Sequence, residues 1–218
     1  MIDFSRLDYA AVQFILEGVL VTLKFTSISV LGGIVLGTIL CFLRLSHIKP
    51  LELISAFYVS IFRGIPLILQ LVMMYFGLAA MGYPFKPFTA GILVFSLNSG
   101  AYIAEILRAG ILAVDKGQVE AAVSLGIRYP RRMVDIIIPQ AIKNILPSLL
   151  NEMVDLLKES ALVSIIGEAD LMRRAQQVAA ARFTYFEPFI IAGACYYVLV
   201  MMISYGVGYF EKRMKTND

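Results

Sequence analysis

Uninterrupted apolar runs constrain this chain more than any other feature of its sequence. Four stretches contain no Asp, Glu, Lys or Arg: residues 25–43, 64–85, 87–104 and 188–210. A helix needs about 20 predominantly apolar residues to cross the hydrocarbon core of a bilayer. Because 59% of the 218 residues are hydrophobic, above the roughly 45–50% typical of soluble domains, the sequence indicates a membrane protein.

A fifth apolar segment, residues 144–167, differs from the others because it contains four charged residues. We count it as a span, since an intramembrane charge normally faces a cavity or a partner. The sequence therefore predicts an all-α integral membrane protein with five transmembrane helices. Their expected bounds are 14–43, 53–81, 87–108, 140–166 (the charged span) and 186–210, in one domain at 14–211 between an external segment at 1–13 and a cytoplasmic tail at 212–218.

Basic residues set the expected orientation. In a five-span arrangement the loop at 44–52, the segment at 105–143 and the tail fall on one side, and together they hold eleven of the 19 Lys and Arg residues. Cytoplasmic loops carry such an excess of positive charge. We therefore expect the N-terminus outside and the C-terminus in the cytoplasm, with basic residues that anchor the chain rather than bind nucleic acid.

The connection before the last span argues against this orientation, because it contains three arginines within residues 173–182. Leu171, Ala175 and Val178 nevertheless recur there at helical spacing. They predict an amphipathic helix lying along the interface, which weakens the orientation without reversing it.

Small residues mark one place where helices are expected to approach closely. Gly33 and Gly37 form a G-x-x-x-G pair, with Cys41 one step further along the same face, and this pattern permits tight packing in lipid. Cys41 and Cys195 both lie inside apolar runs, where a thiol packs as a small hydrophobe. They predict neither a disulfide nor a metal site, and no residue is assigned a catalytic role.

The charges of the charged span predict a passage for a substrate. Projected at 100° per residue, its three acids share an arc of about 60°, and a similar arc on the third span holds polar residues at matching depth. The candidate substrate-binding residues are Asn98, Ser99, Tyr102, Glu105, Glu152, Asp155, Lys158 and Glu159. A broken helix near Gly64 and Pro66 could add donors.

An amino acid needs acceptors for its ammonium group and donors for its carboxylate, and the excess of acid favours a cationic or amidic side chain. The opposing interpretation is structural. It pairs Asp155 with Lys158 at i,i+3 and leaves Glu105 and Glu159 in headgroup water or at a dimer interface.

Residues 115–139 connect the third span to the charged span, and they are less apolar than either. Asp115 with Gln118 resembles a capping box, and Gly126 stands where a helix needs a left-handed residue at its end. These signals predict a short cytoplasmic helix over 116–125. Its candidate docking residues for a cytoplasmic partner are Glu120, Ala121, Ala122, Leu125 and Gly126.

Two prolines define the rest of this segment. Pro130 is expected to begin a second short helix, and Pro139 is expected to interrupt the chain before the charged span. Two short helices would then lie below the membrane. The alternative is an ordinary amphipathic loop that rests on the lipid headgroups.

The string from Glu120 to Pro139 resembles the EAA loop of importer-type ABC permeases, in the spacing of EAA at 120–122, Gly126, Ile136 and Pro139. Further segments resemble the polar amino acid branch of that family, namely FRGIPLILQ at 62–70, LNSGAYIAEILRAGI at 97–111, DKGQ at 115–118 and IPQAIKNILP at 138–147. The similarity covers about residues 14–211. It departs at Ile138, where the family usually has leucine, and at Ile65, where it often has threonine.

This resemblance implies a type I ABC importer permease fold, a coupling helix seated on a dimeric ABC ATPase, and a second permease chain, identical or paralogous. The chain lacks a G-x-x-x-x-G-K-[ST] phosphate loop, so it is not expected to be an enzyme. No cofactor is expected on this chain, and ATP and Mg²⁺ would be used by the partner. The other implied partners are an extracytoplasmic substrate-binding protein, an amino acid and the lipid of a bacterial plasma (inner) membrane.

Three alternatives stay open. RLSHIKP and YVSIFRGIP also resemble cystine permeases, so the same machine could carry cystine. A proton-coupled secondary transporter could use the intramembrane acids as a proton relay. A membrane assembly protein would need no passage at all.

Overall fold

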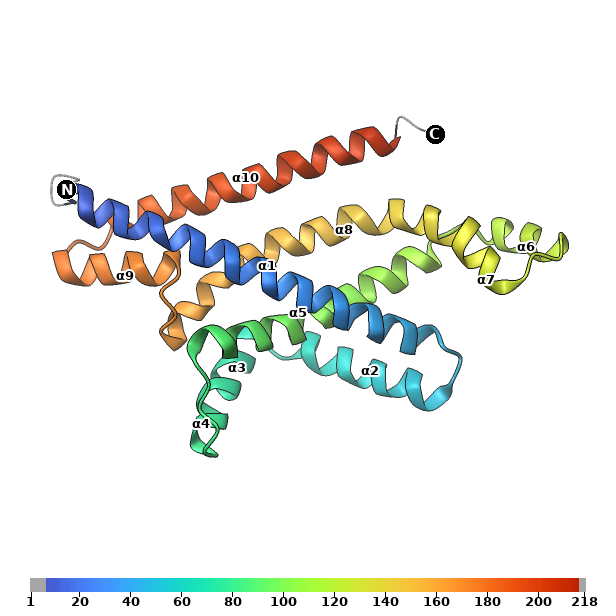
Figure 1. Cartoon of the computed structure of the whole chain (residues 1–218), viewed down its shortest axis with the longest axis horizontal. Coiled ribbons are helices and arrows are strands. Elements are labelled where there is room, and N and C mark those ends of the chain that lie inside the picture. Colours follow the sequence, from blue (N-terminus) through green and yellow to red (C-terminus); the bar gives the residue numbers. More distant parts are fainter. Residues whose placement is uncertain (1–6, 216–218) are drawn as a thin grey trace.

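The computed structural model describes residues 7–215, and for residue 207 and residues 209–215 it describes the backbone alone. Every regular element within the described range is helical (Figure 1). The expected all-α fold is therefore confirmed. Of the expected terminal segments, residues 1–6 and 216–218 lie outside the described residues.

The helices are long, and several continue into one another. In chain order they are α1 (Tyr9–Leu45), α2 (Lys49–Gly64), α3 (Leu67–Val72), a π-helical turn (Met73–Gly77), α4 (Leu78–Ala80), α5 (Pro87–Leu112), α6 (Lys116–Ser124), α7 (Tyr129–Arg131), a π-helical turn (Arg132–Ile137), α8 (Ile138–Glu159), a 3₁₀ segment (Ser160–Ile166), α9 (Leu171–Arg182) and α10 (Glu187–Lys215). Four runs are long and apolar enough to cross a membrane, and the bent pair formed by α2 and α3–α4 makes a fifth when counted as one span. The expected five-helix membrane fold is confirmed.

Pro66 breaks the second span. A proline disfavours helical geometry in the residue before it, and Ile65 is accordingly extended, with φ −106° and ψ 133°. The two halves of the span meet at 101°. The break expected near Gly64 and Pro66 is therefore present, and the span expected over 53–81 turns sharply after Gly64.

Glycines bring α1 and α5 together along the contact that we call the α1–α5 seam (Figure 1). A Cβ atom at Gly33 would lie 2.8 Å from Ser99 Oγ, and one at Gly37 would lie 2.9 Å from the carbonyl oxygen of Gly100. No side chain fits at either position without a shift. The predicted close approach is confirmed, and Cys41 is buried one turn further on.

The connection before α10 contains the expected amphipathic helix. α9 buries Leu171, Ala175 and Val178, but it packs between the start of α1 and α10 instead of lying free along the interface. Its approach to α1 is close, because a Cβ atom at Gly18 would lie 2.6 Å from Leu171 Cα. Tertiary packing within the protein therefore fixes this helix.

A buried acid begins α9. Asp170 is fully buried; its Oδ1 accepts from the Arg173 amide at 2.8 Å and its Oδ2 accepts from the Tyr196 hydroxyl at 3.2 Å. Burial disfavours the charged form and raises the pKa of Asp170 to about 6. Folding therefore binds a proton here at mildly acidic pH.

Pro139 does not interrupt the chain, contrary to expectation. Residues 129–166 form one helical run, in which Pro130 and Pro139 each occupy a first-turn position and Pro147 lies inside α8. A proline in a helix clashes with the carbonyl one turn before it. The π-helical turn at Arg132–Ile137 widens the helix at this point, and such turns accommodate irregularity without ending a helix.

Candidate functional site

The polar arcs predicted on two spans meet in the structure. A cavity of about 320 Å³ lies between α5 and α8, and we call it the acidic cavity. Its lining residues are Asn98, Tyr102, Glu152, Asp155, Lys158 and Glu159. Six of the eight predicted residues therefore lie together, with a formal excess of two negative charges.

The sequence of α8 places the charges on one face. Glu152, Asp155 and Glu159 recur at three- and four-residue spacing, while Leu157 on the opposite face is fully buried in the protein. Lys158 Nζ lies 2.7 Å from Asp155 Oδ1, as the structural interpretation expected. That pair leaves Glu152 and Glu159 as the acids whose charge no neighbouring lysine of α8 balances.

Asn98 lines the acidic cavity but its amide group is already engaged. Asn98 Nδ2 donates to the Phe62 carbonyl at 3.0 Å and to Gln70 Oε1 at 3.3 Å. Gln70 Nε2 donates to the carbonyls of Phe62 and Ile65, at 2.9 and 2.8 Å. These carbonyls are freed where the second span breaks, and in lipid each must find a donor. Asn98 and Gln70 therefore hold the broken helix in place beside the cavity.

Sequence reasoning missed Gln70, although a signal for it was present. A lone glutamine four residues after a proline, in an otherwise apolar run, is suited to cover carbonyls that the proline leaves without helical partners.

Two predicted residues lie outside the acidic cavity. Ser99 is 1% exposed and packs against Gly33 in the α1–α5 seam, and its side chain also interacts with that of Glu152 from behind the cavity lining. Glu105 forms a two-pronged ion pair with Arg108, in which Arg108 Nη2 lies 2.7 Å from Glu105 Oε2. Helical spacing predicted Glu105 and donor chemistry predicted Ser99; in the structure Arg108 neutralises Glu105, and Ser99 lies between the seam and Glu152.

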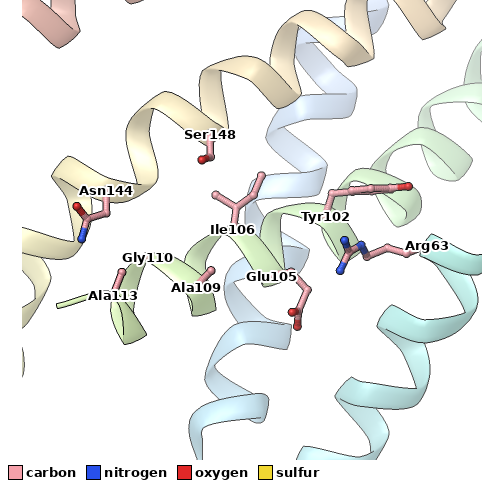
Figure 2. Close-up of a pocket in the computed structure, with 9 residues that line it drawn as sticks. All are labelled: Arg63, Tyr102, Glu105, Ile106, Ala109, Gly110, Ala113, Asn144 and Ser148. Atoms are coloured by element: carbon pink, nitrogen blue, oxygen red, sulfur yellow. The ribbon is translucent and has the colours of Figure 1, made fainter. Parts of the chain in front are cut away.

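A second cavity, of about 470 Å³, lies next to the acidic one along α5 and α8 (Figure 2). Its lining residues are Arg63, Tyr102, Glu105, Ile106, Ala109, Gly110, Ala113, Asn144 and Ser148. Tyr102 lines both cavities. Sequence reasoning did not select Arg63, Asn144 or Ser148, because their meeting depends on how α2 and α8 pack against α5.

α6 has the predicted ends. Asp115 caps it by accepting from the Gly117 amide at 2.6 Å, and Gly126 adopts the left-handed region at φ +68°. The Ile127 and Gly126 amides donate to the carbonyls of Ala122 and Val123, at 3.0 and 2.9 Å, which completes a Schellman motif. The predicted reach of Gln118 back to the Asp115 amide is absent from the hydrogen bonds of the described residues.

The surface of α6 differs in part from the predicted docking face. Ala122 is 2% exposed and turns toward the rest of the protein, because adjacent helical residues are about 100° apart and Ala121 takes the outer side. Leu125 and Val123 are 78% and 55% exposed. α6 lies at one end of the molecule (Figure 1). The apolar surface that it presents there centres on Leu125, with the exposed Ala121, Val123 and Glu120 close to it in the sequence.

The remaining reactive side chains do not form a site. Cys41 and Cys195 are both free thiols. Among the described residues, no three His, Cys, Asp or Glu side chains are grouped so that they could hold a metal ion.

Comparison with known proteins finds relatives that are described as membrane components or permeases of transport systems. A family model described as "Binding-protein-dependent transport system inner membrane component" matches residues 17–216. The chain is 52% identical, over the full length of both chains, to a putative glutamine transport system permease protein of Rickettsia felis. It is also 48% identical to an arginine transport system permease protein of Bacillus subtilis, over 98% of this chain and 100% of that one.

Two solved structures share the fold. An amino acid ABC transporter crystallised with histidines superposes with a TM-score of 0.93 at 45% identity, over 98% of this chain and 99% of that one. An inward-facing methionine ABC transporter superposes with a TM-score of 0.75 at 21% identity, over 95% and 99% of the two chains, which shows likeness of fold alone.

Proposed function

The chain belongs to the family of binding-protein-dependent transport system inner membrane components, and from this premise we propose what it moves and how. It is the permease subunit of an ATP-driven importer of polar amino acids, and it is not an enzyme, because the ATPase is a separate subunit. The observation that supports a translocation role for this chain itself is the acidic cavity, which gathers Glu152, Asp155 and Glu159 on one face of an apolar bundle. Such charges are costly in lipid unless they serve a pathway.

The substrate class follows from the charge of that cavity. Glu152 and Glu159 would accept hydrogen bonds from an ammonium or guanidinium group, and the formal negative excess disfavours an acidic side chain. The relatives named for arginine and glutamine transport support a basic or amidic amino acid. Cystine, carried by the same machine, is the alternative.

The partners follow from the family and from α6. Membership implies an ATPase and a substrate-binding protein; we propose that the ATPase dimer seats on the exposed surface around Leu125 and that a second permease chain completes the passage. This chain would bind no cofactor, and ATP and Mg²⁺ would act on the ATPase. Nucleotide on the ATPase must favour one conformation of the complex over the other, since a ligand that binds both conformations equally well does not shift the equilibrium between them.

For orientation we propose an external N-terminus and a cytoplasmic C-terminus in a bacterial plasma membrane. The arginines on α9 opposed this arrangement in the sequence. In the structure Arg174 Nη1 lies 2.8 Å from Glu17 Oε2, and Arg182 pairs with Asp8. Because Glu17 and Asp8 offset the charges of these arginines, we base the orientation on the basic residues near α6.

Co-purification with the ATPase tests this function. The wild type should retain a candidate ATPase, and Gly126→Asp should lose it, because a side chain at φ +68° strains the end of α6. Gly82→Asp is a matched control, since Gly82 also has a positive φ, of +88°, with open space around it, but lies between α4 and α5. The proposal would be contradicted if neither the wild type nor Gly82→Asp retained the ATPase.

The same complex separates the rival mechanisms. In proteoliposomes, uptake of L-arginine or L-glutamine should require ATP and the binding protein. Uptake driven by a proton gradient without ATP would favour a secondary transporter.

A further inference from the structure

The second cavity is the larger of the two at the α5–α8 gap, and the proposed function does not use it. Its volume, about 470 Å³, falls within the range of roughly 300–1,000 Å³ usual for small-molecule sites. Ala109, Gly110 and Ala113 line it, and α6 begins only three residues after Ala113. It therefore lies on the α6 side of the acidic cavity, with Tyr102 as the common wall (Figure 2).

The charge of this cavity differs from that of its neighbour, because its lining is formally neutral, with one arginine and one glutamate, whereas the acidic cavity has an excess of two negative charges. Glu105 is the one acid in its lining, and the Arg108 guanidinium already binds both oxygens of that carboxylate, at 2.7–3.2 Å. Arg63 lies with its guanidinium 5.1 Å from the Tyr102 ring centre, and no ion pair joins it to a carboxylate among the side chains that the structure describes. Arg63 lies within electrostatic reach of Glu105 and Glu152 but forms a close ion pair with neither among the described residues, so its guanidinium keeps donors for an anionic ligand.

The polar groups around Arg63 suit a carboxylate. Asn144 and Ser148, on the facing helix α8, contribute an amide group and a hydroxyl to the same lining, and both side chains are exposed to the cavity side (Figure 2). A guanidinium binds a carboxylate through two parallel hydrogen bonds, which makes arginine the usual partner for that group.

We propose that this cavity is a second station for the transported amino acid, in which Arg63 binds the substrate carboxylate after the substrate passes Tyr102. This inference rests on the proposed function, because it takes the substrate to be an amino acid. The acidic cavity holds the cationic end, and the second station holds the anionic end on the way toward the α6 side of the permease.

Thiol labelling of the whole permease–ATPase complex in lipid nanodiscs tests the station. Ser148→Cys, in a background in which Cys41 and Cys195 are alanine, places a thiol in the cavity lining. Asn151→Cys is the matched control, because Asn151 lies one turn along α8, is exposed and lines neither cavity. The reagent is N-ethylmaleimide, and the probes are L-arginine, L-glutamine and their neutral amides, L-argininamide and L-glutaminamide.

At least one of the two amino acids should slow labelling of Ser148→Cys by about threefold or more at saturation, while its amide should not and Asn151→Cys should be unaffected. Arg63→Gln should raise the concentration needed for protection by about tenfold, and Arg63→Lys should raise it less, because the charge remains. The thermal unfolding midpoint of each Arg63 variant shows whether its fold is retained.

Equal protection by an amino acid and its amide, or full protection in Arg63→Gln, would overturn the station. So would unprotected Ser148→Cys in a complex that takes up amino acids normally. ATP-dependent uptake measured on the same preparation separates the two proposals. Absence of all uptake by the wild type contradicts the proposed function, whereas normal uptake without protection contradicts the station alone.

Discussion

The two sides of α5 are built in opposite ways. Toward α1, glycines and small residues let the backbones touch, so that even a Cβ atom at Gly37 would collide with Gly100. Toward α8, the helices part around two cavities that are lined by charges. Lipid supplies little hydrophobic force between helices, so close packing must hold the bundle. The difference indicates that the α1–α5 seam supports the fold and the α8 side carries the passage.

Filling the seam should have the largest effect. Gly37→Val would push a branched side chain into Ile103 and the Gly100 carbonyl, and overpacking of this kind costs about 1–3 kcal/mol or more. We expect a large loss of folded permease, measured as thermal unfolding in detergent. Gly193→Val is the control, because nothing in this chain lies within 4 Å of a Cβ atom at Gly193. Equal unfolding midpoints for the two variants would break the comparison.

On the cavity side, a charge change should reduce transport and leave the fold intact. Glu152→Gln removes an acceptor for the substrate cation, and we expect ATP-dependent uptake to fall by about tenfold or more. The unfolding midpoint should stay the same or rise, because one charge fewer is held in an apolar bundle. Glu52→Gln, at an exposed pair with Lys49, should leave uptake unchanged. Normal uptake by Glu152→Gln would remove the acidic cavity from the passage.

The buried acid Asp170, at the start of α9, should make the stability of the protein depend on pH. Asp170 has a pKa raised from 3.8 to about 6, so between these values the folded protein binds a proton that the unfolded chain has released. Stability should therefore fall as pH rises through this window and level off above it, by about 2–3 kcal/mol in all. Asp170→Asn should flatten the profile of unfolding midpoint against pH. A profile that rises over the same window would contradict this assignment.

The smallest effect is expected where the two sides meet. Ser99 packs against Gly33 and interacts with Glu152 without lining the acidic cavity, so Ser99→Ala removes one neutral hydroxyl and should change stability by less than about 1 kcal/mol and uptake by less than about twofold. Parallel unfolding and uptake assays check this. A large loss of uptake at unchanged stability would move Ser99 from the seam into the passage, as the sequence first suggested.

Local patterns in the sequence predicted much of this arrangement. The spacing of Glu152, Asp155 and Glu159 is enough to place them on one helix face. Gly126 correctly predicted the end of α6. The G-x-x-x-G pair likewise predicted the seam. These features depend on residues within one or two helical turns of one another.

What the sequence did not predict depends on tertiary placement. Arg63 reaches the second cavity through the packing of α2 on α5, and Gln70 acquires its partners from the carbonyls that the bend after Gly64 frees. Ala122 faces inward because of how α6 packs on the following turn, which its own nine-residue helix does not encode. Pro139 was predicted to interrupt the chain, but the π-helical turn before it lets the helix continue.

The absence of a break at Pro139 has a mechanical consequence. From Tyr129 to Glu159 the chain forms a single rod of roughly 45 Å at 1.5 Å per residue, with one end beside α6 and the acids of the cavity toward the other. A stiff rod transmits a push along its length, whereas a hinge in its middle would absorb it. The two irregular points of this rod are the widened turn at Arg132–Ile137 and Pro147, so bending would be concentrated there. A displacement applied at α6 would then reach Glu152 through these two points alone.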